Sequence, residues 1–123
     1  MCIRDRAYIT SGNARDIQPW HGWAFEVDLD LWHDEGGERS ISSVFLVTPE
    51  EDENCGDSGS SGSLKRQCGG GLWAPSGPLV INKGDGYEVV LASGNGQLDL
   101  NRRDYANTVM RLGPGLELSL IHI

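Results

Sequence analysis

The chain has 123 residues, with 10 Lys+Arg against 18 Asp+Glu and a formal net charge of −8. Nucleic acids and anionic membranes are bound through basic patches, so this acidic balance argues against both as partners. No apolar run of about 18 residues occurs, which predicts that this segment contains no membrane span. The length suits one domain or part of one.

The two ends of the chain differ in composition from the sequence between them. Residues 1–6 read MCIRDR and residues 118–123 read LSLIHI. Back-translated, the two segments can be one DNA element in opposite orientations, and that element resembles the transposon-end adapter of sequencing libraries. We therefore expect both segments to be adapter-derived and non-native, and residues 7–117 to be a metagenomic fragment of a longer protein. The alternative is a native start methionine and a native apolar tail.

Strand patterns dominate the sequence between these ends. Glycine, which disfavours helix interiors, occurs 17 times, and no apolar series has convincing helical spacing. Alternating and β-branched segments predict an all-β chain with no helix. The predicted strands span residues 7–11, 22–32, 40–48, 72–81, 87–93 and 107–112.

The clearest alternation lies in GWAFEVDLDLW, residues 22–32. One predicted face of this strand carries Trp23, Phe25, Val27, Leu29 and Leu31. The other face carries alanine and three acidic residues. Further along, residues 72–81 contain two prolines, which predicts that the first half of that strand is irregular or lies at an edge. The Asp-Gly pair before residue 87 predicts a hairpin turn.

The loop at residues 49–70 is rich in glycine, serine and charge, and within it Cys55 and Cys68 bracket the stretch CGDSGSSGSLKRQC. A disulfide between Cys55 and Cys68 would close about 14 residues and add roughly 3 kcal/mol of stability through the unfolded state. We predict this disulfide; the alternative is two free thiols. No further Cys or His pair has the spacing of zinc ligands, so no metal site is predicted here. A disulfide would indicate an extracellular or periplasmic protein.

An internal echo links the two halves of the chain. YITSGNARD begins at Tyr8 and VLASGNGQLD begins at Val90, so an apolar strand ends in Ser-Gly-Asn in both places. A polar loop and another strand follow each copy. Repeated strand–loop–strand units with tight glycine turns are typical of stacked propeller blades. A stand-alone β-sandwich remains a further alternative.

Several segments resemble, in the same order, a stretch of the quinoprotein-dehydrogenase-like β-propellers. They read WHGWAFEVD, VFLVTP, GGGLWAPSGPLVI, VVLASGNGQLD and DYANTVMRL. The resemblance spans most of residues 7–112, and its most specific parts are Gly70-Gly71-Leu72-Trp73 and Gly94-Asn95-Gly96. It implies a partial β-propeller of about one and a half four-stranded blades, with the remaining blades of a longer chain as partners. Residues 7–48 would supply the last three strands of one blade, and residues 72–112 the first three of the next.

The resemblance leaves two classes of function open. One is an exported binding or scaffold propeller. The other is a PQQ-dependent oxidoreductase acting on an alcohol or a sugar. The quinone cofactor PQQ and calcium are expected only in the longer protein, because this chain lacks the adjacent cysteines of the quinone-dependent alcohol dehydrogenases. Fold resemblance alone does not establish activity. The sequence therefore names no catalytic or cofactor-binding residue and leaves open whether the protein is an enzyme.

A few polar residues could carry chemistry, but each also has a structural interpretation. The segment from Asp99 through Asn101 to Asp104 could hold calcium, whereas the structural interpretation is turn capping, with the neighbouring arginines pairing with acids. His21 could be a base or a ligand; we predict a hydrogen-bonded residue at a strand entry. His33 is predicted to be solvated.

Two further features are interpreted in the same way. The acidic run at residues 50–54 is predicted to be a solvated loop. Trp73, which follows three glycines, is predicted to pack between blades, and the alternative is the wall of a central ligand site.

Overall fold

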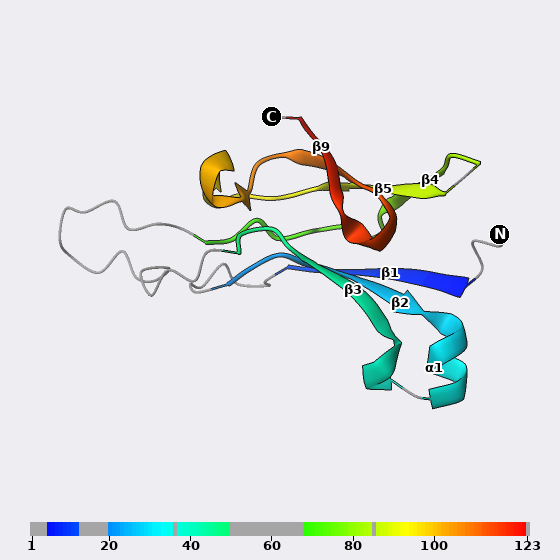
Figure 1. Cartoon of the computed structure of the whole chain (residues 1–123). Helices are drawn as coiled ribbons and strands as arrows, with labels where there is room; N and C mark the ends of the chain where they lie inside the picture. The colour runs from blue at the N-terminus through cyan, green and yellow to red at the C-terminus, as the bar shows by residue number, and fades with distance from the viewer. Residues whose placement is uncertain (1–4, 13–19, 36, 50–67, 85, 123) are drawn as a thin grey trace, which may run out of the picture.

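The computed structural model of the chain describes residues 5–12, 20–35, 37–49, 68–84 and 86–122. One antiparallel sheet has the order β1-β2-β3, a second has the order β4-β5-β8-β9, and β6 and β7 form a small pair (Figure 1). The strands are β1 (Arg6–Ser11), β2 (Trp23–Asp28), β3 (Ile41–Leu46), β4 (Leu79–Asn82), β5 (Tyr87–Ala92), β6 (Leu98–Asp99), β7 (Asp104–Tyr105), β8 (Val109–Leu112) and β9 (Leu118–His122). The helical segments are α1 (Leu29–Glu35) and the 3₁₀ turns Gly37–Ser40, Leu100–Arg102 and Pro114–Leu116. The prediction of a mostly β chain is confirmed.

All six predicted strand regions contain a strand, although most strands are shorter than predicted. Residues 72–78 carry no strand, as the prolines indicated, and pairing begins only at Leu79. The predicted hairpin is confirmed between β4 and β5, where the Lys83 N–H donates to the Gly86 carbonyl at 2.9 Å. Residues 118–122, expected to be non-native, form β9 at the edge of the second sheet; the origin of that segment stays a prediction.

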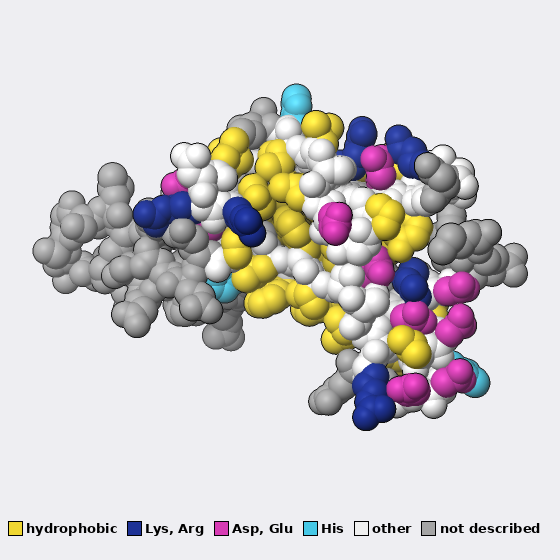
Figure 2. All heavy atoms as spheres, in the orientation of Figure 1, with side chains coloured by type: hydrophobic (Ala, Val, Ile, Leu, Met, Phe, Trp, Pro, Cys, Tyr) yellow, Lys and Arg dark blue, Asp and Glu magenta, His cyan; other side chains and the backbone are white. Residues whose placement is uncertain are grey.

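The prediction that the chain has no helix is wrong, because α1 replaces the end of the predicted strand at residues 22–32. The Asp28 carboxylate accepts hydrogen bonds from the backbone N–H groups of Asp30 and Leu31, both at 3.0 Å. This is helix N-capping, which stabilises a first helical turn. Leu29 and Leu31 therefore leave the strand face to which their alternation assigned them. The acidic side chains of α1 gather on one projecting corner of the molecule (Figure 2).

Asp28 gives the chain an expected acid sensitivity. The Leu31 N–H holds the pKa of Asp28 below its ordinary value, and the Arg6 guanidinium beside it acts in the same direction. Because the folded-state pKa is lowered, this stabilisation is present above the unfolded pKa and is lost as the pH falls through the folded value. Urea unfolding between pH 5 and pH 3 should show a smaller loss of stability for Asp28→Asn than for the unsubstituted chain. Identical pH dependence would contradict this.

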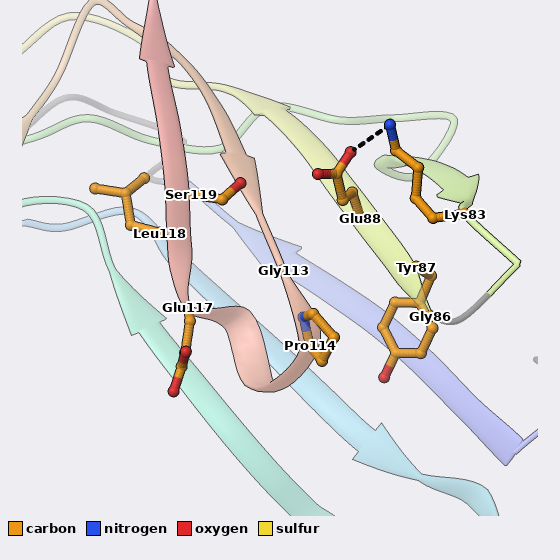
Figure 3. A pocket seen from close by; sticks show the side chains of 9 residues that line it. All are labelled: Lys83, Gly86, Tyr87, Glu88, Gly113, Pro114, Glu117, Leu118 and Ser119. Carbon is orange, nitrogen blue, oxygen red and sulfur yellow. Dashed lines mark ion pairs between the residues drawn. The ribbon is translucent and has the colours of Figure 1, made fainter.

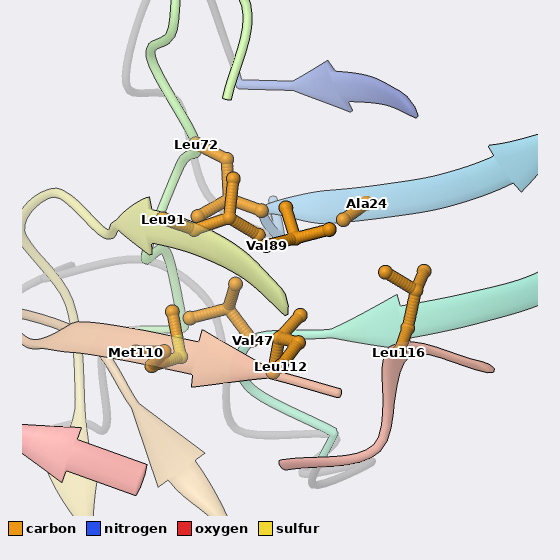
Figure 4. Packing of buried hydrophobic residues seen from close by; sticks show 8 residues of the cluster. All are labelled: Ala24, Val47, Leu72, Val89, Leu91, Met110, Leu112 and Leu116. Atoms are coloured by element: carbon orange, nitrogen blue, oxygen red, sulfur yellow. The ribbon is translucent and has the colours of Figure 1, made fainter. Parts of the chain in front are cut away.

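The second sheet covers the face of β2 opposite to the apolar one that its alternation indicated, although Val27 on the apolar face is also buried, at 4% exposure. Ala24 and Glu26 are 3% and 4% exposed and point toward the second sheet. Phe25 and Trp23, whose rings stack with centroids 6.0 Å apart, lie on the other side. The residues between the sheets form one apolar cluster (Figure 4). Its buried members are Ala24, Val47, Leu72, Val89, Leu91, Met110, Leu112 and Leu116.

The two sheets repeat one structural unit. β1 and β5 both lead into Ser-Gly-Asn and pair with β2 and β8, which in turn pair with β3 and β9. Both pairs contain a β-bulge that shifts the register by one residue. In the β2–β3 pair the shift follows Glu26, and in the β8–β9 pair it follows Arg111. The extra residue in both bulges is a serine. The Ser42 hydroxyl donates to the Glu26 carbonyl at 3.2 Å, and the Ser119 hydroxyl donates to the Arg111 carbonyl at 2.9 Å. β1, β2 and β3 thus correspond to β5, β8 and β9.

Corresponding faces of the two sheets point the same way. Counted back from Ser11 and Ser93, Ala7 and Ile9 correspond to Val89 and Leu91. Val89 and Leu91 are buried between the sheets, whereas Ile9 is on the outside. The sheets therefore pack head to tail: one face of the repeat unit meets the opposite face of the next unit.

Candidate functional site

The sequence motifs that carried the family resemblance converge at one end of the sheets, on the segment Cys68–Leu72. This segment, which we call the glycine strap, runs between the loops of both sheets. On the first-sheet side, the Gly69 N–H donates to the Trp20 carbonyl, the Gly22 N–H to the Gly69 carbonyl and the Leu72 N–H to the Ser11 carbonyl. On the second-sheet side, the partners are Asn95, Gln97 and Gly94, and all six bonds are 2.8–3.2 Å long. The strap therefore joins the two sheets through backbone hydrogen bonds.

Glycine is required here because the backbones approach too closely for a side chain. A Cβ on Gly22 would lie 2.0 Å from the Gly70 carbonyl oxygen, and a Cβ on Gly96 would lie 2.4 Å from the Cys68 carbonyl oxygen. Gly69 and Gly70 also have φ values of +101° and +71°, a region that residues with a Cβ rarely adopt. The strap is a closely packed junction.

Trp73 lies against the glycines of both Ser-Gly-Asn copies. A Cβ on Gly12 would lie 2.8 Å from the indole ring, and one on Gly94 would lie 3.4 Å from it. Gly12 follows β1 and Gly94 follows β5, so the ring contacts both repeat units. The predicted packing of Trp73 between propeller blades stays a prediction. The indole is still 53% exposed, so this end also presents a flat aromatic surface to solvent.

His21 lies where predicted, at the entry to β2. Its Nδ1 is 2.9 Å from the Thr48 hydroxyl oxygen, and that hydroxyl donates to the Gly69 carbonyl at 3.1 Å. Thr48 is 1% exposed. The predicted hydrogen-bonded role of His21 is confirmed, and it links the end of the first sheet to the strap.

Sequence reasoning missed a buried carboxylate between the sheets, that of Glu26, which is 4% exposed. Its Oε2 accepts from the hydroxyls of Tyr8 and Tyr87, each at 3.2 Å, and its Oε1 accepts from the Ser42 hydroxyl at 2.8 Å. The Arg6 Nε lies 3.5 Å from Oε1. Both carboxylate oxygens therefore have partners, and the bond from Tyr87 of β5 to Oε2 joins the second sheet to the first. Alternation assigned Glu26 to a polar face, and only the packing of the second sheet shows that this face is covered.

The two tyrosines belong to this cluster. Their rings meet edge to face with centroids 5.7 Å apart. Burial raises the pKa of Tyr8 above its ordinary value, and Tyr87 and Glu26 raise it further. Tyr8 therefore stays protonated and donates its hydrogen bond to Glu26 throughout the neutral pH range.

A shallow pocket of about 390 Å³ lies at the opposite end of the second sheet (Figure 3). It lies between the β4–β5 turn and the Pro114–Leu116 turn. Lys83 and Glu88 line it and form an ion pair at 3.2 Å. The full lining is Lys83, Gly86, Tyr87, Glu88, Gly113, Pro114, Glu117, Leu118 and Ser119. None of the segments that carried the family resemblance contributes a residue to this lining, and Leu118 and Ser119 belong to the segment expected to be non-native.

The proposed turn-capping role of Asp99 is confirmed. Its carboxylate accepts from the Asn101 N–H at 3.1 Å, and the Arg102 Nε lies 3.7 Å away. His33 is exposed and 2.9 Å from the Asp34 carboxylate, as expected for a solvated residue. Asp104 is buried, at 3% exposure. Within the described ranges, no three His, Cys, Asp or Glu side chains are grouped so that they could hold a metal ion.

The cysteine prediction falls partly outside the described residues. Cys68 is 2% exposed at the start of the glycine strap. Cys55 and the acidic run at residues 50–54 belong to the part of the chain that is not described. The Cys55–Cys68 disulfide stays a prediction.

Comparison with family models, curated proteins and solved structures finds no match to this chain. Among the described residues, no helix is both long and apolar enough to cross a membrane.

Proposed function

We propose that this chain is a segment of an exported quinoprotein-like β-propeller, in which it acts as a scaffold or binding module. The observation that carries the proposal is the head-to-tail packing of two repeated units, in which the pair β1–β2 corresponds to the pair β5–β8. Strand β9 lies in residues expected to be non-native and is not needed for this correspondence. Propellers are built by radial repetition of such sheets. A sandwich of the immunoglobulin type instead uses Greek-key connections, which neither large sheet has in the described residues.

The outer faces of the sheets also support a propeller over a stand-alone sandwich. Ile9, Phe25 and Val44 lie side by side across the first sheet, on what we call the first-sheet outer face. Ile9 is 53% and Val44 is 49% exposed. Outward-facing residues of a sandwich are normally polar. A sheet with two apolar faces is expected where both faces are covered by neighbours, as in an interior blade.

The proposed role is structural because the described contacts are packing contacts. The backbone groups of the strap bond to loops of both sheets, and the Thr48 hydroxyl, which pairs with His21, bonds to the strap. Separately, Glu26 of the first sheet bonds to Tyr87 of the second. The glycine strap then holds Trp73 and the adjoining loops in place for presentation at one end of the propeller. Loops carried on a rigid scaffold are where binding surfaces are commonly built.

Recovering the flanking reading frame from the source DNA tests this proposal. We expect further copies of the strand, Ser-Gly-Asn, loop and strand unit, together with a signal peptide. Flanks with no further copy would contradict the propeller. Adjacent cysteines and a set of Glu, Asn and Asp facing the axis would favour the PQQ-dependent oxidoreductase. Reduction of an electron-acceptor dye by the long protein loaded with PQQ and calcium would then contradict the scaffold role.

Export predicts the oxidation state of the cysteine pair. Mass spectrometry of unreduced, exported protein should recover the Cys55 and Cys68 peptides joined and two hydrogens lighter than the dithiol. Closing this polar loop compensates for its small apolar content. Reduced and alkylated protein is the control. Free thiols in the unreduced sample would remove the support for export.

A further inference from the structure

We propose that the chain associates with further copies of itself, head to tail, through the two sheet faces that its internal packing leaves uncovered. In this assembly, the outer face of the first sheet in one copy packs against the outer face of the second sheet in the next copy. The inference uses the same internal packing as the proposed function, but it concerns the 123-residue chain on its own. In a longer propeller the neighbouring blades would cover these two faces instead.

The chain itself contains one example of the proposed contact. The inner face of the first sheet, with Tyr8, Ala24 and Glu26, packs on the inner face of the second sheet, with Val89, Leu91 and Met110. The outer face of the second sheet corresponds to the inner face of the first sheet. In the strand register, Val90, Val109 and Arg111 hold the places of Tyr8, Ala24 and Glu26. The outer face of the first sheet corresponds to the inner face of the second sheet. Its residues Ala7, Ile9 and Phe25 hold the places of Val89, Leu91 and Met110. The two uncovered faces are thus the same complementary pair.

Both uncovered faces are apolar enough to associate. On the second-sheet outer face, Leu79, Val90, Arg111 and Leu120 form one row across the four strands. Leu79 is 61% and Leu120 is 53% exposed. Arg111, which is paired with Glu88, interrupts this row, and the leucines at its two ends remain exposed. Exposed apolar side chains gathered on one face mark interaction sites.

The charged residues on the second-sheet outer face also have counterparts in the internal contact. Arg111 Nε lies 3.5 Å from the Glu88 carboxylate. Arg6 Nε lies 3.5 Å from the Glu26 carboxylate. Glu88 and Arg111 correspond to Arg6 and Glu26, so the two sheets carry the same cross-strand ion pair with its charges exchanged. The Glu26 pair is accommodated inside the internal contact, so its counterpart is compatible with burial.

A contact between two different faces is heterologous, which gives it a distinctive assembly behaviour. Each copy keeps one free face of each kind after binding, so copies add in series and close into a ring where the rotation allows. Contact between two identical faces would instead stop at a dimer. The two geometries can therefore be separated by blocking one face at a time.

Sedimentation velocity over a concentration series tests the proposal with single-face variants. Ile9→Lys blocks the first-sheet outer face and Leu120→Lys blocks the second-sheet outer face. We expect the unsubstituted chain to associate, each variant alone to be monomeric with at least about tenfold weaker association, and an equimolar mixture of the two to form dimers and nothing larger. Leu100→Lys is the control, because Leu100 is 50% exposed but lies on neither face; it should associate like the unsubstituted chain.

Four results would overturn the proposal: a monomeric unsubstituted chain, undiminished association of either blocked variant, a monomeric mixture, or loss of association in the control. A Leu120→Lys variant that still dimerises while Ile9→Lys does not would indicate contact between identical first-sheet faces. Circular dichroism checks that each variant keeps its strands. If a lysine variant unfolds, Ile9→Thr and Leu120→Thr repeat the test with β-branched residues that suit a strand. A monomeric chain would leave the proposed function to be judged by the flanking reading frame.

Discussion

Replacing Gly22 with alanine is expected to unfold the chain. The added Cβ would lie 2.0 Å from the Gly70 carbonyl oxygen, and backbone atoms on both sides of this contact are hydrogen-bonded. Neither neighbour can move without breaking the strap that joins the sheets. Overpacking without room to relax costs several kcal/mol, so we expect a loss of more than about 3 kcal/mol. Urea unfolding followed by circular dichroism measures it.

Gly37→Ala is the matched control for this substitution. Neither Gly22 nor Gly37 has left-handed backbone geometry, so alanine is tolerated by the backbone at both positions. A Cβ on Gly37 would meet the Trp32 ring at 3.6 Å, an ordinary contact. We expect this variant to stay within about 0.5 kcal/mol of the unsubstituted chain. Equal stability of both variants would show that the strap is not packed as described.

Replacing Glu26 with alanine is expected to destabilise the chain by about 3–5 kcal/mol. The substitution removes the acceptor shared by the Tyr8 and Tyr87 hydroxyls, one from each sheet, and the partner of Arg6. Buried donors left without acceptors carry their full desolvation cost. Urea unfolding at low micromolar protein concentration, where association is minimal, gives the value.

Glu88→Ala separates this effect from the loss of any cross-strand ion pair. Glu88 pairs with Arg111 and Lys83 on the outer face of the second sheet, where its side chain is 20% exposed. Because the partners are 40% and 46% exposed, we expect a loss of no more than about 1 kcal/mol. If both substitutions cost the same, the Glu26 cluster is not a special contact between the sheets.

Much of the fold could be predicted from alternation and turn residues. The β4–β5 hairpin followed from an Asp-Gly pair, and the irregular segment before β4 followed from its prolines. The strand ending at Asp28 was extended too far because Leu29 and Leu31 continue a two-residue period. The capping of α1 depends on where the Asp28 carboxylate points, which alternation does not report.

The faces of the sheets were harder to predict than the strands. Val27 and Phe25 favour burial of the apolar side of β2, yet the second sheet covers the side with Glu26. Hydrophobicity ranks the two faces of a strand by composition, whereas the neighbouring sheet decides which is covered. A repeat of Ser-Gly-Asn was visible in the sequence, but the paired bulge serines emerged only from the strand register.

The candidate site shows the same division. His21 was placed correctly because a strand entry defines its local geometry. The Glu26 cluster was missed because Tyr8, Glu26 and Tyr87 are far apart in sequence and meet only when the sheets pack. A buried acid with several long-range donors leaves no local signal.

Nuclear Overhauser contacts between side chains test the central claim, the head-to-tail packing of the two sheets, most directly. The Leu120→Lys variant, in which association between copies is blocked, is the suitable sample. Head-to-tail packing predicts contacts between the rings of Tyr8 and Tyr87 and between those of Phe45 and Tyr105, whose centroids are 5.7 and 6.1 Å apart. Contacts from Ile9 or Val44 to Met110 within one chain would contradict it, because they would place the opposite face of the first sheet against the core.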